Sequence, residues 1–128
     1  MILLDSDVAI DVLRGLPPAI NWFSARPQDE VVIIPGYVAM ELIWGTRDTQ
    51  DQRETERWLS QFQIAWIEPT QCQQAYQTLN AVHLRNAIDT LDMLIAYVAI
   101  SLDLPLYTFN QKHFDVVPGL KTIRPYTR

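Results

Sequence analysis

Three carboxylic acids, far apart in this 128-residue chain, each stand in a strongly apolar segment. An unpartnered carboxylate in a protein interior costs several kcal/mol, and acids brought close together raise one another's pKa. No Lys or Arg lies within the three segments. A hard divalent cation, which prefers carboxylate oxygens, is the economical way to offset their charge. The acids are Asp5, which ends a short apolar run, Glu41 and Asp92.

Each acid also has an explanation that needs no cation. Asp5 or Ser6 could simply cap the first helix. Glu41 could be a surface residue of its helix, and Asp89 could cap a helix that carries Asp92 in its first turn, where the helix dipole favours an acid. None of these alternatives requires the acids to meet in space, whereas a metal site does.

The acids must be positioned by an alternation of short apolar runs and amphipathic stretches. The runs are rich in β-branched residues, and Pro or Gly ends several of them. Expected strands are Met1 to Leu4, Val31 to Ile34, Ile64 to Ile67, Leu106 to Thr108 and Thr122 to Arg124. Expected helices are Val8 to Leu13, Pro18 to Ala25, Tyr37 to Trp44, Asp48 to Phe62, Gln71 to Arg85 and Thr90 to Leu102.

Strands separated by helices predict an α/β fold with a mainly parallel sheet, helices on both faces and right-handed crossovers. In such sheets ligands bind beyond the carboxyl ends of the strands. Asp5 and Asn110 both fall just past a predicted strand. We therefore expect the chemistry at that edge of the sheet.

Composition narrows the class of protein. The chain is 48% hydrophobic and carries a single cysteine, Cys72, which predicts one globular domain without disulfides in the reducing cytoplasm. The longest apolar stretch is too short and too polar to span a bilayer, so no membrane association is expected. The formal charge of -5 argues against a general basic surface for nucleic acid. A local basic excess from Asn110 to Arg128 could still guide a polyanion.

Four motifs in order make the chain resemble the PIN-domain family, specifically the VapC-type ribonuclease toxins of bacterial toxin-antitoxin pairs. The resemblance runs nearly end to end and covers residues 1–128 as one PIN-like nuclease domain. The motifs are Leu3-Leu4-Asp5-Ser6-Asp7 with Leu13-Arg14-Gly15, Glu41-Leu42-Ile43-Trp44-Gly45, Asp92-Met93-Leu94-Ile95-Ala96, and Tyr107-Thr108-Phe109-Asn110 through His113-Phe114 to Pro118-Gly119-Leu120.

The resemblance implies a three-layer α/β/α sandwich that hydrolyses RNA with Mg²⁺, or Mn²⁺, held by Asp5, Glu41 and Asp92. Asn110 stands where many members have a fourth acid, which favours one tightly held ion over two. Ser6 would orient water or phosphate. The resemblance also implies a homodimer inhibited by an antitoxin, which we expect to lie across Asp48 to Phe62 and to offer a basic side chain to the acids.

The remaining polar residues of these motifs carry weaker expectations. Asp7 and Asp115 are expected to cap helices or to be exposed, His83 to lie on a helix surface, and His113 to be structural or adjacent to the substrate. Two other functions stay open. One is a PIN-like module that binds proteins without catalysis. The other is a haloacid-dehalogenase-like phosphatase, whose nucleophile would be the Asp after the first strand.

Overall fold

The computed structural model describes residues 1–128 and contains a five-stranded sheet in which every neighbouring pair is parallel. The strand order is β3-β2-β1-β4-β5. Strand β1 lies in the centre with all three residues buried, as expected for a strand covered on both faces. The strands are β1 (Ile2–Leu4), β2 (Val32–Pro35), β3 (Gln63–Ala65), β4 (Leu106–Tyr107) and β5 (Thr122–Ile123).

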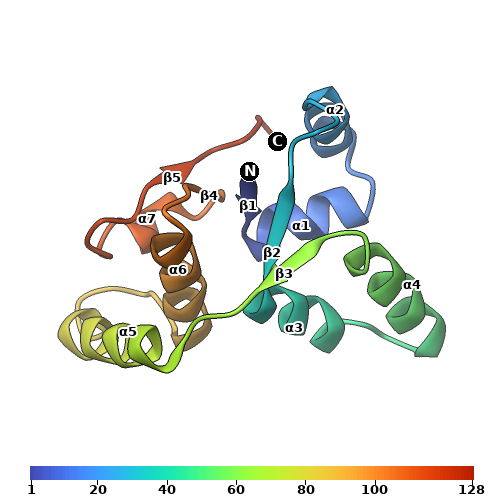
Figure 1. Cartoon of the computed structure of the whole chain (residues 1–128). Helices are drawn as coiled ribbons and strands as arrows, with labels where there is room; N and C mark the ends of the chain where they lie inside the picture. Colours follow the sequence, from blue (N-terminus) through green and yellow to red (C-terminus); the bar gives the residue numbers. More distant parts are fainter.

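Seven helices complete two outer layers. Figure 1 shows α5 and α6 on one side of the strands and α1, α2 and α4 on the other, which confirms the predicted α/β/α architecture. None of the helices has the length and apolar character needed to cross a membrane. The helices are α1 (Ser6–Leu13), α2 (Pro17–Ala25), α3 (Gly36–Trp44), α4 (Thr49–Leu59), α5 (Pro69–Val82), α6 (Thr90–Leu102) and α7 (Gln111–Phe114).

The topology creates one natural crevice. After β1 the chain crosses to β2 on one side, whereas after β3 it crosses to β4 on the other side of β1. The carboxyl ends of β1 and β4 therefore flank a topological switch point, the usual ligand position in open parallel sheets. Helix α3, which carries Glu41, packs against both α1, which starts after Asp5, and α6, which carries Asp92.

Local hydrogen bonds determine where the helices at this edge of the sheet begin. Asp5 is the N-cap of α1 and accepts from the Ser6 backbone N–H, while Asp89 is the N-cap of α6 and accepts from the Asp92 backbone N–H. Both contacts satisfy backbone donors that a helix leaves unpaired at its first turn. Helix α6 ends at Asp103, whose φ of 53° breaks the helical path.

Several predicted boundaries were wrong by a few residues. Helix α4 is shorter than predicted because Asp48 is its N-cap. Helix α5 starts earlier, where Glu68 and Gln71 form a capping box in front of Pro69. Helix α7 was not predicted at all, since a single turn carries no detectable periodicity.

The start of α3 yields a stability test, because this helix carries Glu41. A Cβ on Gly36 would overlap the Trp66 indole, which packs edge-to-face on Tyr37 at 5.3 Å. We expect Gly36→Ala to lower the free energy of unfolding by about 1–3 kcal/mol in a urea titration.

Gly45→Ala is the matched control at the other end of α3. A Cβ there meets only backbone oxygens at 3.5 and 3.8 Å, and φ is -81°, so stability should change by about 0.5 kcal/mol or less, or rise slightly. Equal unfolding midpoints for the two variants would show that Trp66 moves aside without cost.

Candidate active site

Asp5 is the most buried of the predicted acids. It is 3% exposed at the end of β1, and its two oxygens accept separate hydrogen bonds. The Ser6 backbone N–H donates to Oδ1 (2.8 Å), and the Thr108 hydroxyl donates to Oδ2 (2.7 Å). Burial, followed by the charge of Asp7, raises the pKa of Asp5 to about 7. This carboxyl is therefore poised to titrate near neutral pH.

Thr108 joins the two strands that flank the crevice. It follows β4 directly, is fully buried, and accepts from the Asn110 backbone N–H (2.9 Å) while donating to Asp5. The next residue, Phe109, donates its backbone N–H to Oδ2 of Asp7 (2.9 Å). The end of β4 thus fixes both acids at the start of α1. Thr108 was not predicted as a site residue, because its role depends on the pairing of β1 with β4.

The position of Asp7 differs from our prediction. It was predicted to cap a helix or to be exposed, but it lies half-buried in the first turn of α1. Its charge raises the pKa of each of the other three acids, Asp5, Glu41 and Asp92. Burial raises the pKa of Asp7 itself. Asp7 therefore belongs to the same electrostatic cluster.

Asp92 connects the remaining members. Burial, followed by the charge of Asp89, raises the pKa of Asp92 to about 6. Burial, followed by the charge of Asp92, raises the pKa of Glu41 on α3. Asp92 also contributes to the raised pKa of Asp5. Asp92, from one element, therefore acts electrostatically on both of the other predicted acids, which come from two other elements far apart in the sequence. We call Asp5, Asp7, Glu41 and Asp92 the acid cluster.

No basic side chain forms an ion pair with the acid cluster, although the charges of Arg128 and His113 lower the pKa of Asp7 and of Asp92. The ion pairs of the chain join Met1 to Glu30, Arg47 to Asp51 and Arg128 to Asp11, and none includes a cluster member. One oxygen of Glu41, Oε1, is buried without any hydrogen-bond partner. Oxygen donors in excess of positive charge fit a hard divalent cation. No group of three or more His, Cys, Asp or Glu side chains already converges as an ion-binding set.

The other predicted residues lie around the cluster. Ser6 is half-buried next to Asp5. The side chain of Asn110 is bound to the ring of His113 and makes no hydrogen bond to an acid. His83 is exposed at the end of α5, as predicted, and Asp115 is exposed at the end of α7, as predicted.

The C-terminal residues contact α1 and the segment after β4, next to the acid cluster. The Tyr126 hydroxyl and the Arg128 guanidinium both donate to Oδ2 of Asp11 on α1 (2.8 and 2.9 Å). The same guanidinium lies 4.2 Å from the centre of the Phe109 ring. These contacts hold α1 against the segment after β4, the two elements that Thr108 joins.

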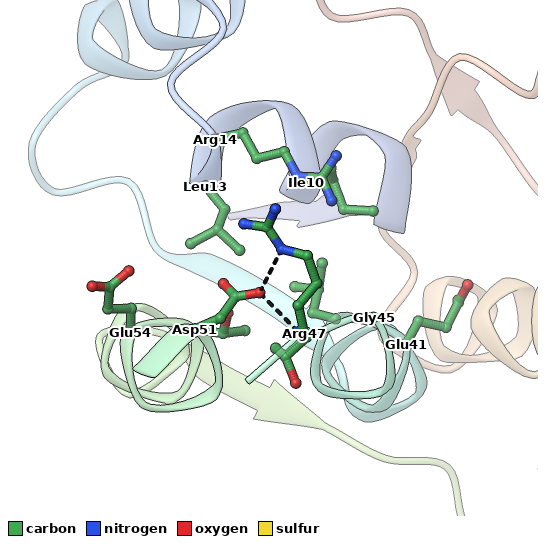
Figure 2. A pocket seen from close by; sticks show the side chains of 11 residues that line it. Ile10, Leu13, Arg14, Glu41, Gly45, Arg47, Asp51 and Glu54 are labelled. Atoms are coloured by element: carbon green, nitrogen blue, oxygen red, sulfur yellow. Dashed lines mark hydrogen bonds and ion pairs between the residues drawn. The ribbon is translucent and has the colours of Figure 1, made fainter. Parts of the chain in front are cut away.

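A cavity of about 520 Å³ lies beside the cluster but does not contain it. It opens between α1, α3 and α4, with Ile10, Leu13 and Leu42 among its lining residues. Glu41 stands at its margin, and Figure 2 shows the Glu41 carboxylate pointing away from Arg47 and Asp51. The cavity and the acid cluster are therefore two neighbouring features that share Glu41.

The raised pKa of Asp5 predicts how stability depends on pH in the metal-free protein. Because the pKa of Asp5 is about 7 in the folded state against 3.8 for a solvated aspartate, the folded state binds the proton more tightly, and stability falls as pH rises from about 4 to about 7. This difference corresponds to up to about 4 kcal/mol. Asp5→Asn, which stays neutral, should gain stability over the parent at pH 8 and match it near pH 4 in urea titrations with EDTA.

Asp29→Asn, at an exposed acid between α2 and β2, should show no such pH-dependent gain. A stability difference between Asp5→Asn and the parent that stays constant from pH 4 to pH 8 would contradict the raised pKa.

Comparisons with known proteins identify the family of this chain. The PIN domain family matches residues 2–120. Ribonuclease VapC10 of Mycobacterium tuberculosis is 35% identical over 122 residues, which cover 94% of this chain and 91% of that protein. A toxin-antitoxin complex from Klebsiella pneumoniae contains a chain with a TM-score of 0.74, 26% identity and full coverage of both chains.

The fold extends to more distant proteins. The VapBC2 complex of Rickettsia felis, bound to a promoter DNA fragment, contains a chain with a TM-score of 0.78 and 24% identity, covering 96% of this chain and 98% of that one. At that identity the likeness shows the fold alone. The extent of the family match excludes a haloacid-dehalogenase-like phosphatase. The chain belongs to the PIN-domain family and, within it, to the VapC-type ribonuclease toxins.

Proposed function

We propose that residues 1–128 form one metal-dependent nuclease domain that hydrolyses RNA phosphodiester bonds as the toxin of a type II toxin-antitoxin pair. The observation that carries this proposal is that Asp92 raises the pKa of both Asp5 and Glu41, in a cluster that forms no ion pair with a basic side chain. Such a cluster is costly for stability, and strongly raised pKa values of neighbouring acids are typical of a functional site.

In this proposal Asp5, Glu41 and Asp92 hold Mg²⁺, with Mn²⁺ as a competent substitute. Such an ion, when bound, acidifies water and offsets negative charge on the phosphate. The unpartnered Oε1 of Glu41 supports its role as a ligand. Asn110 adds no negative charge, which favours a single tightly held ion.

The protein side chains orient the reacting groups. The hydrogen bonds from Thr108 and from the Ser6 backbone fix the rotamer of Asp5, so that its carboxylate stays aimed into the crevice. The Ser6 hydroxyl is free to orient water or a phosphate oxygen. In-line attack by hydroxide would leave a 5′-phosphate and a 3′-hydroxyl, without using the RNA 2′-hydroxyl as the nucleophile.

We also propose that the cognate antitoxin fills the cavity between α1, α3 and α4. The cavity offers apolar side chains together with Arg14, Arg47 and Glu54, which suits an amphipathic segment. Because Glu41 lies at its margin, a segment seated there would reach the acid cluster with a basic side chain. This placement includes the α4 residues over which we expected the antitoxin to lie.

A homodimer is the assembly that the surface favours. Met40 and Trp44 on α3 are 55% and 90% exposed, and Tyr76 on α5 and Leu84 beyond it are 64% and 91% exposed. Large exposed apolar side chains on neighbouring helices are typical of a protein interface. We propose that a second copy covers them and that the enzyme works in the cytoplasm.

Two variants test the nuclease proposal. Asp92→Asn and Glu41→Gln each remove a ligand charge, so each should lower RNA cleavage by about 100-fold or more, as should EDTA added to the parent. Asp115→Asn, at an exposed acid outside the cluster, should cleave at the parent rate. Cleavage is followed on a labelled RNA with Mg²⁺, and circular dichroism verifies the fold.

The same assay separates the alternatives. A parent protein that cleaves no RNA under any metal condition, yet binds its antitoxin, would identify a non-catalytic binding module. Full activity of Asp92→Asn would remove this residue from the metal site.

A further inference from the structure

Asn110 and His113 form a pair at the end of β4. The Asn110 amide nitrogen lies 2.7 Å from Nδ1 of His113, and the His113 backbone N–H donates to the Asn110 carbonyl (3.1 Å). The Asn110 backbone is itself held by the Thr108 hydroxyl, the group that binds Asp5. The pair is therefore attached directly to the crevice between β1 and β4.

This contact selects one form of the imidazole ring. An amide nitrogen has only protons to donate, so Nδ1 of His113 must accept, and the ring proton resides on Nε2. The ring makes no other hydrogen bond. Asn110 thus leaves His113 with Nε2–H as a free donor.

His113 is also the basic residue whose charge affects the pKa of Asp92. In its protonated form the ring lowers the pKa of Asp92 against the larger influence of burial, yet the two side chains form no ion pair. His113 is half-buried, whereas the second histidine of the chain, His83, is exposed at the end of α5. Ionised carboxylates only accept hydrogen bonds, so the His113 ring adds a donor to a site that otherwise offers the Ser6 hydroxyl.

The phosphate oxygens of an RNA bound at this cluster are also hydrogen-bond acceptors and donate no proton. Its negative charge needs donors as well as a cation, and fixed donors aimed at charge that grows during reaction are an efficient source of rate. A neutral Asn at position 110 supplies that orientation, because an Asp there would accept from Nδ1–H and leave Nε2 without its proton in the neutral ring.

We propose that His113 is a catalytic residue whose Nε2–H donates to a phosphate oxygen of the bound RNA, and that Asn110 is the positioning residue that keeps this proton on Nε2. The inference rests on the proposed nuclease function and adds a role for the residue that replaces the fourth acid. It also predicts that Asn110 acts only through His113.

Kinetics of single and double variants test the pairing. His113→Ala should lower kcat by about 10- to 100-fold, the value of one hydrogen bond to a charged group, with little change in KM. His113→Gln, whose amide can donate from a similar position, should recover part of the loss. Asn110→Ala should lower kcat by a smaller factor, and the double variant Asn110→Ala/His113→Ala should be no slower than His113→Ala alone. His83→Ala is the control and should match the parent.

A second readout does not depend on cleavage. Nitrogen-15 chemical shifts of the His113 ring in the metal-free parent, recorded where the ring is neutral, should show the Nε2–H tautomer. Asn110→Ala should show a mixture of both tautomers.

The outcomes separate this inference from the function on which it rests. If Asp92→Asn is inactive while His113→Ala keeps the parent rate, the nuclease function stands and the role of His113 is refuted. Losses that multiply in the double variant, or an Nδ1–H tautomer in the parent, would refute the positioning role of Asn110. If the parent cleaves no RNA, both proposals fail together.

Discussion

The buried carboxylate of Asp5 is the constraint on which the architecture of the site depends. Its hydrogen bond from Thr108 joins residues 103 positions apart in the sequence and connects the ends of the two central strands. The same carboxylate caps α1, so one side chain both links β1 to the residue after β4 and stabilises the first turn of the adjacent helix. Burial without a cationic partner raises the pKa of Asp5 to about 7. A bound cation would stabilise the ionised carboxylate and offset this cost.

The acids of the site could be predicted because burial and charge conflict visibly in a sequence. Asp5, Glu41 and Asp92 each interrupt an apolar segment, and the alternation of strands and helices predicts that Asp5 lies at one sheet edge together with Asn110. Thr108 and Asp7 could not be found in this way. A buried threonine looks ordinary in a strand, and Asp7 resembles any acid in a first helical turn. Their roles come from the β1–β4 pairing, which only the fold reveals. The single turn α7, which carries His113, is likewise too short for a pattern.

Two neighbouring features meet at Glu41 and suggest how activity and inhibition are linked. On one side lies the acid cluster, where the charge of Asp92 reaches Glu41, and on the other lies the cavity between α1, α3 and α4. A polypeptide in that cavity would adjoin Glu41, a proposed metal ligand. In this arrangement α3 serves both features, since it packs on α1 and on α6 and contributes one face to each.

The most direct measurement is the anomalous diffraction of Mn²⁺ in crystals of the parent protein. Our account predicts one strong peak whose ligands include carboxylate oxygens contributed by β1, α3 and α6 at once. The account would be contradicted if the crystals bound Mn²⁺ elsewhere or not at all and the three side chains pointed toward different surroundings.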